Sequence, residues 1–188
     1  SVFVCHLNHG IRAQTAERDE KFTKKLAEKL SLPFYSEKVN IPELYKNTHI
    51  SLETAARNER YAFFERAAYY FNADKIATAH TMSDNAETVI FNICRGSGTE
   101  GLCGIPPVRD NFIRPLIKMS RIEVENYLAT LSQDFVIDET NYDEEYSRNF
   151  LRHSVIPKLK TLNPSLEGAL FRLSESSRKD REYFDSLL

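Results

Sequence analysis

The sequence predicts an α/β fold in which helices cover both faces of a parallel β-sheet. Short apolar runs with β-branched residues alternate along the chain with longer segments in which apolar residues recur every three or four positions. The short runs are typical of strands buried on both faces, and the longer segments are typical of amphipathic helices. Strands that alternate with helices build parallel sheets, because the chain must cross back before it adds the next strand.

The first half of the chain carries most of the expected strands. We predict strands at residues 2–7, 33–39 and 75–79, and a short extended segment at 112–116. Helices are predicted at 15–30 and at 51–71, where Ser51 can cap the first turn. A further helix follows the third strand and can be capped by Thr81 or Ser83.

The second half is expected to be mostly helical. Ser120 and Glu123 form a capping box that opens a helix over 120–131. A helix over 146–159 is expected to end near Pro157, and Asn163 with Pro164 opens the last helix. From residue 163 the pattern is only helical. We therefore predict one α/β domain over 1–160 and the start of a helical domain over 161–188.

The composition is that of an ordinary globular protein. The chain has 188 residues, of which 41% are hydrophobic and 28% charged, and its formal net charge is -2. A polyanion must therefore be held by local basic patches and not by a global positive field. Cys5, Cys94 and Cys103 are far apart and form no CxxC pair, which favours buried free thiols over a disulfide framework or zinc site. No long apolar stretch is present, so we expect a cytoplasmic protein without a membrane partner.

Polar side chains follow two of the expected strands, and ligands of open parallel sheets bind beyond the carboxyl ends of strands. The first segment, HLNHGIR, spans His6 to Arg12, and its Gly10 allows a sharp turn. Taken alone, the residues favour a plain strand-to-helix turn over a phosphate site. The second segment, ATAHTMSDNAET, spans Ala77 to Thr88.

The second segment places one imidazole and two carboxylates at a helix start. His80, Asp84 and Glu87 lie at i, i+4 and i+7, a spacing that puts them on one face. Such a group can bind Mg²⁺, hold an ammonium group or move protons. The alternative is that Asp84 only complements the helix dipole. Zinc is disfavoured, because no cysteine or second histidine lies nearby.

Two other features can bind anions. A glycine-rich turn runs from Arg95 to Gly98, and its free N–H groups can hold a phosphate, although a plain helix C-cap explains it equally. Basic side chains are spaced along two predicted helices and suit either phosphate contact or a solvated face; they are Arg57, Arg60, Arg148, Arg152, Lys158 and Lys160.

Six stretches of this sequence, taken in order, resemble the tRNA(Ile)-lysidine synthetases, a family of N-type ATP pyrophosphatases with a PP-loop. The stretches are HLNHGIR, SLETAARNERYAFF, ATAHTMSDNAET, RGSGTEGLCGIPP, IRPL and DETNYDEEYSRNFLRHSVIPKL, and they span about residues 2 to 160. The resemblance implies a Rossmann-like, adenine nucleotide alpha hydrolase-like fold. It also implies that ATP adenylates the C2 oxygen of the wobble cytidine in tRNA(Ile) with anticodon CAU, and that free lysine then displaces AMP to form lysidine.

The resemblance also implies roles for residues of this sequence. Catalytic roles fall on His80, Asp84 and Glu87. Nucleotide contacts fall on His6, Asn8, Arg95, Gly96, Ser97 and Gly98, and tRNA contacts on Arg57, Arg60, Arg148, Asn149 and Arg152. The expected cofactors are ATP and Mg²⁺, the expected substrates are tRNA(Ile) and free lysine, and a homodimer is a family-level expectation. Which carboxylate binds the metal stays open.

The sequence departs from the family pattern at three places. Ser83 and Asp84 stand where the family has two aspartates, and Thr81 stands where it has a second histidine. The family's SGGxDS loop is not among the 188 residues, and we expect it before Val2. The alternatives are another PP-loop enzyme such as a cytidine thiolase, whose usual CxxC is absent here, and a non-catalytic tRNA-binding module.

Overall fold

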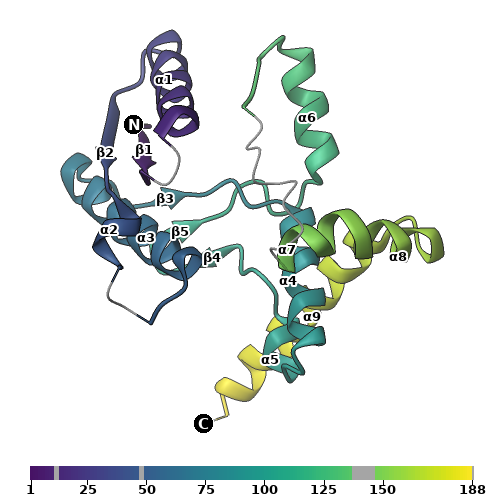
Figure 1. The fold of residues 1–188 in the computed structure, drawn as a ribbon. Helices are drawn as coiled ribbons and strands as arrows, with labels where there is room; N and C mark the ends of the chain where they lie inside the picture. The colour runs from purple at the N-terminus through teal and green to yellow at the C-terminus, as the bar shows by residue number, and fades with distance from the viewer. Residues whose placement is uncertain (11–12, 47–48, 137–146, 188) are drawn as a thin grey trace. The chain divides into compact units, whose positions relative to one another are not determined.

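A computed structural model describes residues 1–10, 13–46, 49–136 and 147–187. Arg12 and the acidic stretch 138–146 therefore lie outside the described residues. The chain divides into two compact units, Ser1–Ile76 and Ala77–Leu188, and each is described by itself. The expected α/β class is confirmed, with parallel strands and helices on both faces (Figure 1).

The first unit is built around two parallel strands. Strand β1 (Val4–Asn8) pairs with β2 (Phe34–Lys38), with Val4 opposite Phe34 and Asn8 opposite Lys38. Helix α1 (Ala13–Lys29) is the crossover connection that parallel pairing requires. Both strands and this helix match the predicted elements to within two residues. A four-residue helix, α2 (Ile41–Leu44), was not predicted; Asn40 caps it by accepting a hydrogen bond from the Glu43 N–H.

Helix α3 (Leu52–Phe71) supplies the core of the first unit. Its N-cap is Ser51, as predicted, whose hydroxyl accepts from the Thr54 N–H, and it ends at Asn72 in a left-handed conformation. Phe63 and Ala67 are buried with Leu7 of β1, and Tyr35 of β2 packs against the same cluster. The cluster joins the helix to both strands, and it thereby fixes the carboxyl end of β1, where the HLNH segment lies.

The second unit carries a small sheet of order β3–β5–β4, made of β3 (Ile76–Ala77), β5 (Phe112–Ile113) and β4 (Val108–Arg109). Its strands are shorter than expected, and β4 with β5 forms an antiparallel hairpin that was not predicted. A two-residue turn, Asp110–Asn111, closes the hairpin. Asp110 has φ of 57°, a conformation that Asp tolerates better than most residues, because its short side chain bonds locally.

The rest of the second unit is helical. Its helices are α4 (Met82–Cys94), α5 (Thr99–Leu102), α6 (Arg121–Thr130), α7 (Ser147–Phe150), α8 (Ile156–Leu162) and α9 (Leu166–Asp185). The capping box predicted for α6 is present, with Ser120 and Glu123 bonded reciprocally. Helix α9 starts two residues later than expected, although Asn163 still accepts a hydrogen bond from the Ser165 N–H in the turn before it.

In the second unit, helix α9 packs against α4. The predicted boundary between an α/β domain over 1–160 and a helical domain over 161–188 stays a prediction. Asn85 of α4 is fully buried and donates to the Ser174 hydroxyl of α9 at 3.2 Å. Apolar packing holds α9 against α4, because Leu166 and Leu170 of α9 pack on the cluster that contains Ile90. A role of residues 161–188 in tRNA contact stays a prediction.

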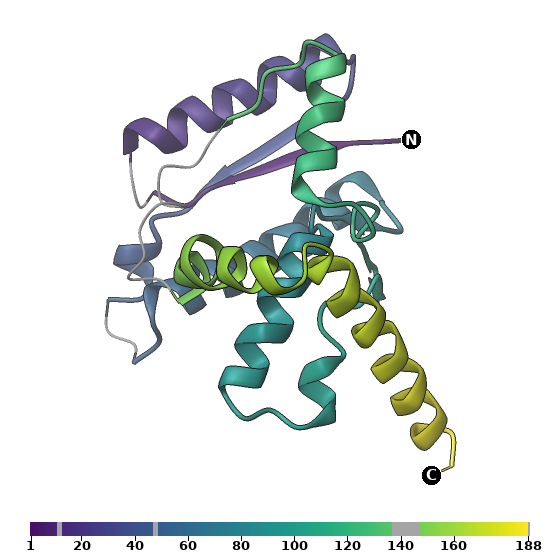
Figure 2. The same ribbon diagram turned by 90° about the vertical axis from the view of Figure 1, so that its right-hand side faces the viewer.

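The helix expected to end near Pro157 continues past it. A π-helical turn, η2 (Leu151–Val155), follows α7, and Pro157 then stands in the first turn of α8. Figure 2 shows α7, η2 and α8 as one helical run before the chain turns into α9. Proline is tolerated in a first helical turn, where its missing N–H has no partner to lose. The prediction was therefore wrong about where the helix ends.

The cysteines are free, as predicted, but they are not all buried. Cys103 is buried, Cys5 is half-buried, and Cys94 at the end of α4 is exposed. Among the described residues, no helix combines the length and apolar character needed to cross a membrane.

Gly104 is held in a crowded, left-handed position that only glycine suits. Its φ is +59°, and a Cβ there would lie 2.3 Å from Asn85 Oδ1 and 2.9 Å from Ser174 Oγ. Asn85 cannot move aside easily, because its Oδ1 accepts the Ile105 N–H at 2.8 Å. The loop after α5 is therefore locked onto α4 and α9.

Gly104→Ala is expected to lower the free energy of unfolding by about 2 kcal/mol or more, through the clash and the strained φ. Chemical denaturation measures the loss. The matched control is Gly168→Ala on α9, whose Cβ meets nothing closer than 3.5 Å. That change should stabilise the protein by about 0.5–1 kcal/mol, since alanine favours a helix. Equal effects of the two substitutions would contradict this account of Gly104.

Candidate functional site

The start of α4 is shaped by a capping box. Thr81 is the N-cap, and its N–H and hydroxyl both donate to Asp84 Oδ2 at 2.7 Å. The Asp84 N–H donates back to the Thr81 hydroxyl at 3.4 Å. Of the two caps that the sequence allowed, the structure therefore uses Thr81 and not Ser83. One carboxylate oxygen of Asp84 is committed to the helix end, which also suits a negative charge there.

One turn further along α4, Glu87 forms a two-pronged ion pair with Arg152 of η2. Arg152 Nε lies 2.6 Å from Glu87 Oε1, and Arg152 Nη2 lies 3.0 Å from Glu87 Oε2. The Glu87 side chain is only 5% exposed, against 23% for Arg152. Burial raises the pKa of Glu87 above its ordinary value, and the Arg152 guanidinium opposes that rise. The guanidinium therefore provides the charge that the buried carboxylate needs.

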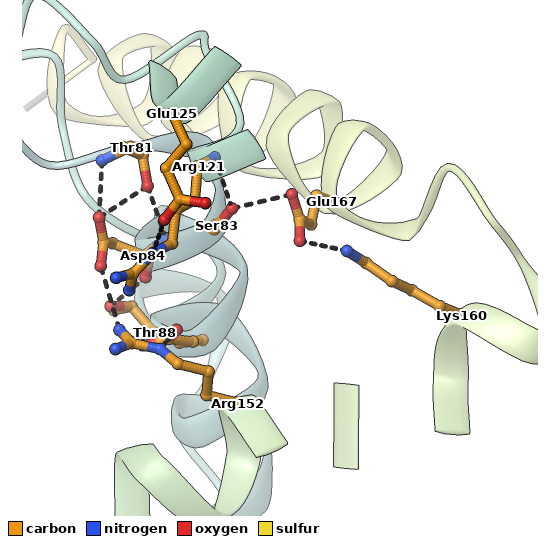
Figure 3. A network of polar contacts seen from close by, with 10 residues as sticks. Thr81, Ser83, Asp84, Thr88, Arg121, Glu125, Arg152, Lys160 and Glu167 are labelled. Atoms are coloured by element: carbon orange, nitrogen blue, oxygen red, sulfur yellow. Dashed lines mark hydrogen bonds and ion pairs between the residues drawn. The ribbon is translucent and has the colours of Figure 1, made fainter. Parts of the chain in front are cut away.

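The two carboxylates differ in what they can still bind. Asp84 Oδ1 is 3.5 Å from Arg152 Nη2, and its side chain is 32% exposed (Figure 3). Glu87 has both oxygens occupied by Arg152. A cationic ligand that approaches α4 therefore meets Asp84 first. The structure brings Asp84, Glu87 and Arg152 together and gives the two carboxylates different partners.

His80 lies just before the N-cap and is therefore outside the helix. Its Nδ1 is 2.9 Å from the Thr78 hydroxyl, and its side chain is half-buried. The helical i, i+4, i+7 spacing predicted for His80, Asp84 and Glu87 thus holds only for the last two. Extended backbone, not a helical turn, separates His80 from Asp84.

A second polar chain leaves the same helix end and was missed by the sequence analysis. Ser83 donates to Glu167 Oε2 at 3.0 Å, and Lys160 Nζ lies 2.5 Å from Glu167 Oε1 (Figure 3). The Ser83 hydroxyl also accepts the Arg121 N–H at 3.2 Å. Three helices, α4, α6 and α9, are thereby joined at one serine, and Lys160 of α8 is linked to them through Glu167. No sequence signal links Ser83 to Glu167, because 84 positions separate them.

The first unit carries the other candidate segment at the end of β1. Asn8 is 1% exposed, donates to Glu20 Oε2 at 3.1 Å, and accepts the Gly10 N–H at 3.1 Å. Hydrogen bonds from Asn8 and Ser36 lower the pKa of Glu20. Gly10 has φ of +66°, and a Cβ on it would approach the Val39 carbonyl oxygen at 3.0 Å. Asn8 is therefore engaged in building the turn.

His9 is the unusual group in this turn. Burial, the Arg60 guanidinium and the neighbouring His6 together lower the pKa of His9 from 6.5 to about 4. Arg60 Nη2 lies 3.4 Å from His9 Nε2. Burial also lowers the pKa of His6, although Glu20 opposes it. Both imidazoles are neutral at pH 7, so they offer a donor and an acceptor and not a positive charge.

The Arg95–Gly98 turn lies at the opposite end of α4 from the capping box. Arg95 is the C-cap, its guanidinium stacks on the Phe91 ring at 5.2 Å, and Gly96 takes φ of +73°. Arg95 follows Asp84 by 11 positions, so this turn begins about 16 Å from Asp84 along the helix axis. The geometry is that of a helix C-cap, the alternative that the sequence left open. A nucleotide role for Arg95, Gly96, Ser97 and Gly98 stays a prediction.

The predicted tRNA-contacting residues fall in different environments. Arg57 is exposed on α3, where it stacks on Tyr61 at 5.2 Å, and Arg60 is exposed beside His9. Arg148 is exposed on α7, whereas Asn149 is only 9% exposed. Exposure suits Arg57 and Arg148 for contact with phosphate, and a tRNA contact by the buried Asn149 stays a prediction.

Comparison with known proteins finds a close family. The PP-loop domain model matches residues 1–159. The chain is 43% identical, over its whole length, to a tRNA(Ile)-lysidine synthase of Clostridium acetobutylicum, and 41% identical, over 92% of its length, to one of Thermotoga sp. (strain RQ2). It spans 41% of the length of each of these two relatives.

A likeness to a solved structure concerns the fold alone. The U34-tRNA thiolase NcsA of Methanococcus maripaludis superposes with a TM-score of 0.72, over 92% of this chain and 61% of the thiolase chain. Sequence identity between the two is 17%.

Arg152→Ala is expected to lower the free energy of unfolding by about 3 kcal/mol at pH 7, because Glu87 is left buried without its cation. The loss should grow as the pH rises through the folded pKa of Glu87, because removal of the guanidinium lets burial raise that pKa further than in the wild type. Denaturation at several pH values measures it. The control is Arg121→Ala, which breaks the exposed pair with Glu125 and should cost about 1 kcal/mol or less. A loss independent of pH would count against the buried pair.

His9→Gln is expected to make the protein less sensitive to mild acid. In the wild type, the free energy of unfolding decreases as the pH falls from 6.5 toward 4. In this range His9 binds a proton in the unfolded chain but stays neutral in the folded protein. Thermal unfolding at pH 7.5 and pH 5, chosen about the ordinary histidine pKa, measures the difference. His49→Gln, at an exposed position, is the control. Identical acid sensitivity in wild type and His9→Gln would reject this explanation.

Proposed function

Because the chain belongs to the PP-loop domain family, we propose that the protein containing it forms lysidine on tRNA(Ile). The observation that carries the proposal is the strong similarity to tRNA(Ile)-lysidine synthases along the whole chain, together with the Asp84–Arg152–Glu87 group at the start of α4. The family implies ATP as the activating co-substrate. Free lysine is proposed as the second substrate.

The proposed reaction needs activation, because C2 of cytosine is a poor electrophile. ATP transfers its adenylyl group to the C2 oxygen of the wobble cytidine, and pyrophosphate leaves. The ε-amine of lysine then attacks C2, the bond from C2 to the adenylated oxygen breaks, and AMP departs with the electron pair. Lysine is an ammonium ion at pH 7, so a proton must leave the nitrogen before or during attack.

Asp84 is our candidate for handling the lysine amine. Its side chain is 32% exposed, against 5% for Glu87, and its Oδ2 is held by Thr81, which fixes the orientation of the carboxylate. A carboxylate so fixed can attract the ammonium group and accept its proton. Glu87 serves a different purpose in this proposal: it holds Arg152, whose positive charge suits a phosphate of the adenylated base.

The remaining assignments follow the same proposal. We assign tRNA phosphate contact first to the exposed Arg57 and Arg148, and nucleotide contact to His6 at the end of β1. Among the described residues, no cluster of three or more acidic, histidine or cysteine side chains is placed to hold a metal ion. Our proposal is that Mg²⁺ is bound mainly by the phosphates of ATP, as is usual for this ion. Homodimerisation stays an expectation of the resemblance.

Asp84→Asn is expected to abolish lysine incorporation into tRNA(Ile), since an amide neither attracts an ammonium group nor accepts its proton. The complete protein is incubated with ATP, labelled lysine and the tRNA transcript, and labelled tRNA is counted. Asp110→Asn makes the same chemical change in the hairpin turn and should leave incorporation unchanged. Wild-type incorporation by Asp84→Asn would reject the role of Asp84. Binding of tRNA by the wild type without any incorporation would favour the non-catalytic module.

A further inference from the structure

The π-helical turn η2, which carries Arg152, lies between α7 and α8. It covers Leu151–Val155, and the Ile156 N–H donates to the Leu151 carbonyl oxygen, five residues back. In an α-helix, the Ile156 N–H would instead donate to the carbonyl oxygen of residue 152, four residues back. The π turn therefore contains one residue more than a regular turn, and every side chain before it is shifted around the helix axis.

That shift decides which side chain faces α4. Ile156 is buried in a cluster with Ile90 of α4. In a regular helix, the neighbour of Ile156 on the same face would be Arg152, four positions earlier, and Leu151 would lie about 140° away. In the structure, Leu151 takes that place and is 6% exposed, in the same cluster as Ile156 and Ile90.

Arg152 consequently lies at the edge of the apolar contact and not inside it. There its guanidinium reaches Glu87, which precedes Ile90 by three positions on the same side of α4. A regular helix anchored at Ile156 would press the charged group onto Ile90, or would turn Leu151 out into water. Each is costly, because it buries an unpaired charge or exposes apolar surface.

Pro157 supplies a chemical reason for the extra residue. Proline has no N–H to donate, and its ring would collide with the carbonyl oxygen of His153, four residues earlier, if the helix were regular. A wider turn before the proline removes that collision, and π turns of this kind recur where helices are interrupted. Pro157 itself is exposed, so packing against other elements does not explain its presence.

We propose that Pro157 is a positioning residue, which imposes the π turn and thereby directs the Arg152 guanidinium onto Glu87. Its consequence for catalysis rests on the proposed function, whereas its consequence for the ion pair does not. Pro157 touches no substrate in this proposal; it acts only through Arg152.

The test is a titration of Glu87 in the complete protein with ¹³C-labelled glutamate, read by NMR and assigned with Glu87→Gln. Pro157→Ala restores the N–H and removes the ring. The titration midpoint of Glu87 is expected to shift upward, in the same direction as in Arg152→Ala, because the guanidinium no longer faces the carboxylate. In the Arg152→Ala background, Pro157→Ala should cause no further shift. Pro164→Ala, in the exposed turn before α9, is the matched control and should cause none.

Lysidine formation is the second readout. Its kcat/KM should fall about 100-fold in Pro157→Ala, since a small displacement of a positioned group is enough for such a loss. An unshifted Glu87 midpoint in folded Pro157→Ala, and in Pro157→Gly as a second variant, overturns the positioning role. A shifted midpoint supports that role even if the wild type forms no lysidine, and in that case the proposed function alone fails. The positioning role is also overturned if Pro157→Ala still shifts the Glu87 titration midpoint in the Arg152→Ala background.

Discussion

The ion pair between Glu87 and Arg152 is the contact on which the second unit's candidate site depends. It joins α4 to the π turn with two short hydrogen bonds, at a place where the carboxylate is almost fully buried. Removing either partner leaves a buried charge, which costs far more than losing a surface pair. Leu151 and Ile156 pack on Ile90 beside the pair. The ion pair and the apolar packing therefore favour the same alignment of the π turn against α4.

The ion pair also makes the environments of Asp84 and Glu87 different. Both Glu87 oxygens bond Arg152, so Asp84 is the more exposed carboxylate, and the capping box fixes its orientation. Ser83, at the preceding position, bonds Glu167 of α9 and the backbone of α6, so the same helix end is tied to two other helices. The helix end that carries the Asp84 carboxylate is thus fixed by neighbouring elements, as a preorganised site requires.

Features that depend on neighbouring residues, such as helix caps, were predicted correctly from the sequence. Contacts between residues far apart in the sequence were not predicted. The caps of α3 and α6 were predicted because Ser51 and the Ser120–Glu123 box act within four residues. Asp84 and Glu87 were singled out by their spacing and Arg152 as one of several basic side chains, but periodicity alone did not show that Arg152 pairs with Glu87, 65 positions away. Pro157 was read as a helix end, since the 3.6-residue pattern cannot reveal a π turn. The exposure of Cys94 and the Ser83–Glu167 contact depend on packing that composition does not show.

The most direct test of this account is a double-mutant cycle between Glu87 and Arg152, with Glu87→Gln, Arg152→Met and the double variant unfolded by denaturant at neutral pH. Each single change should be strongly destabilising, and the double variant should recover much of the loss. A coupling free energy of about 2–3 kcal/mol is the predicted result. Additive losses, with a coupling of about 0.5 kcal/mol or less, would mean that the two side chains act independently and would contradict the account.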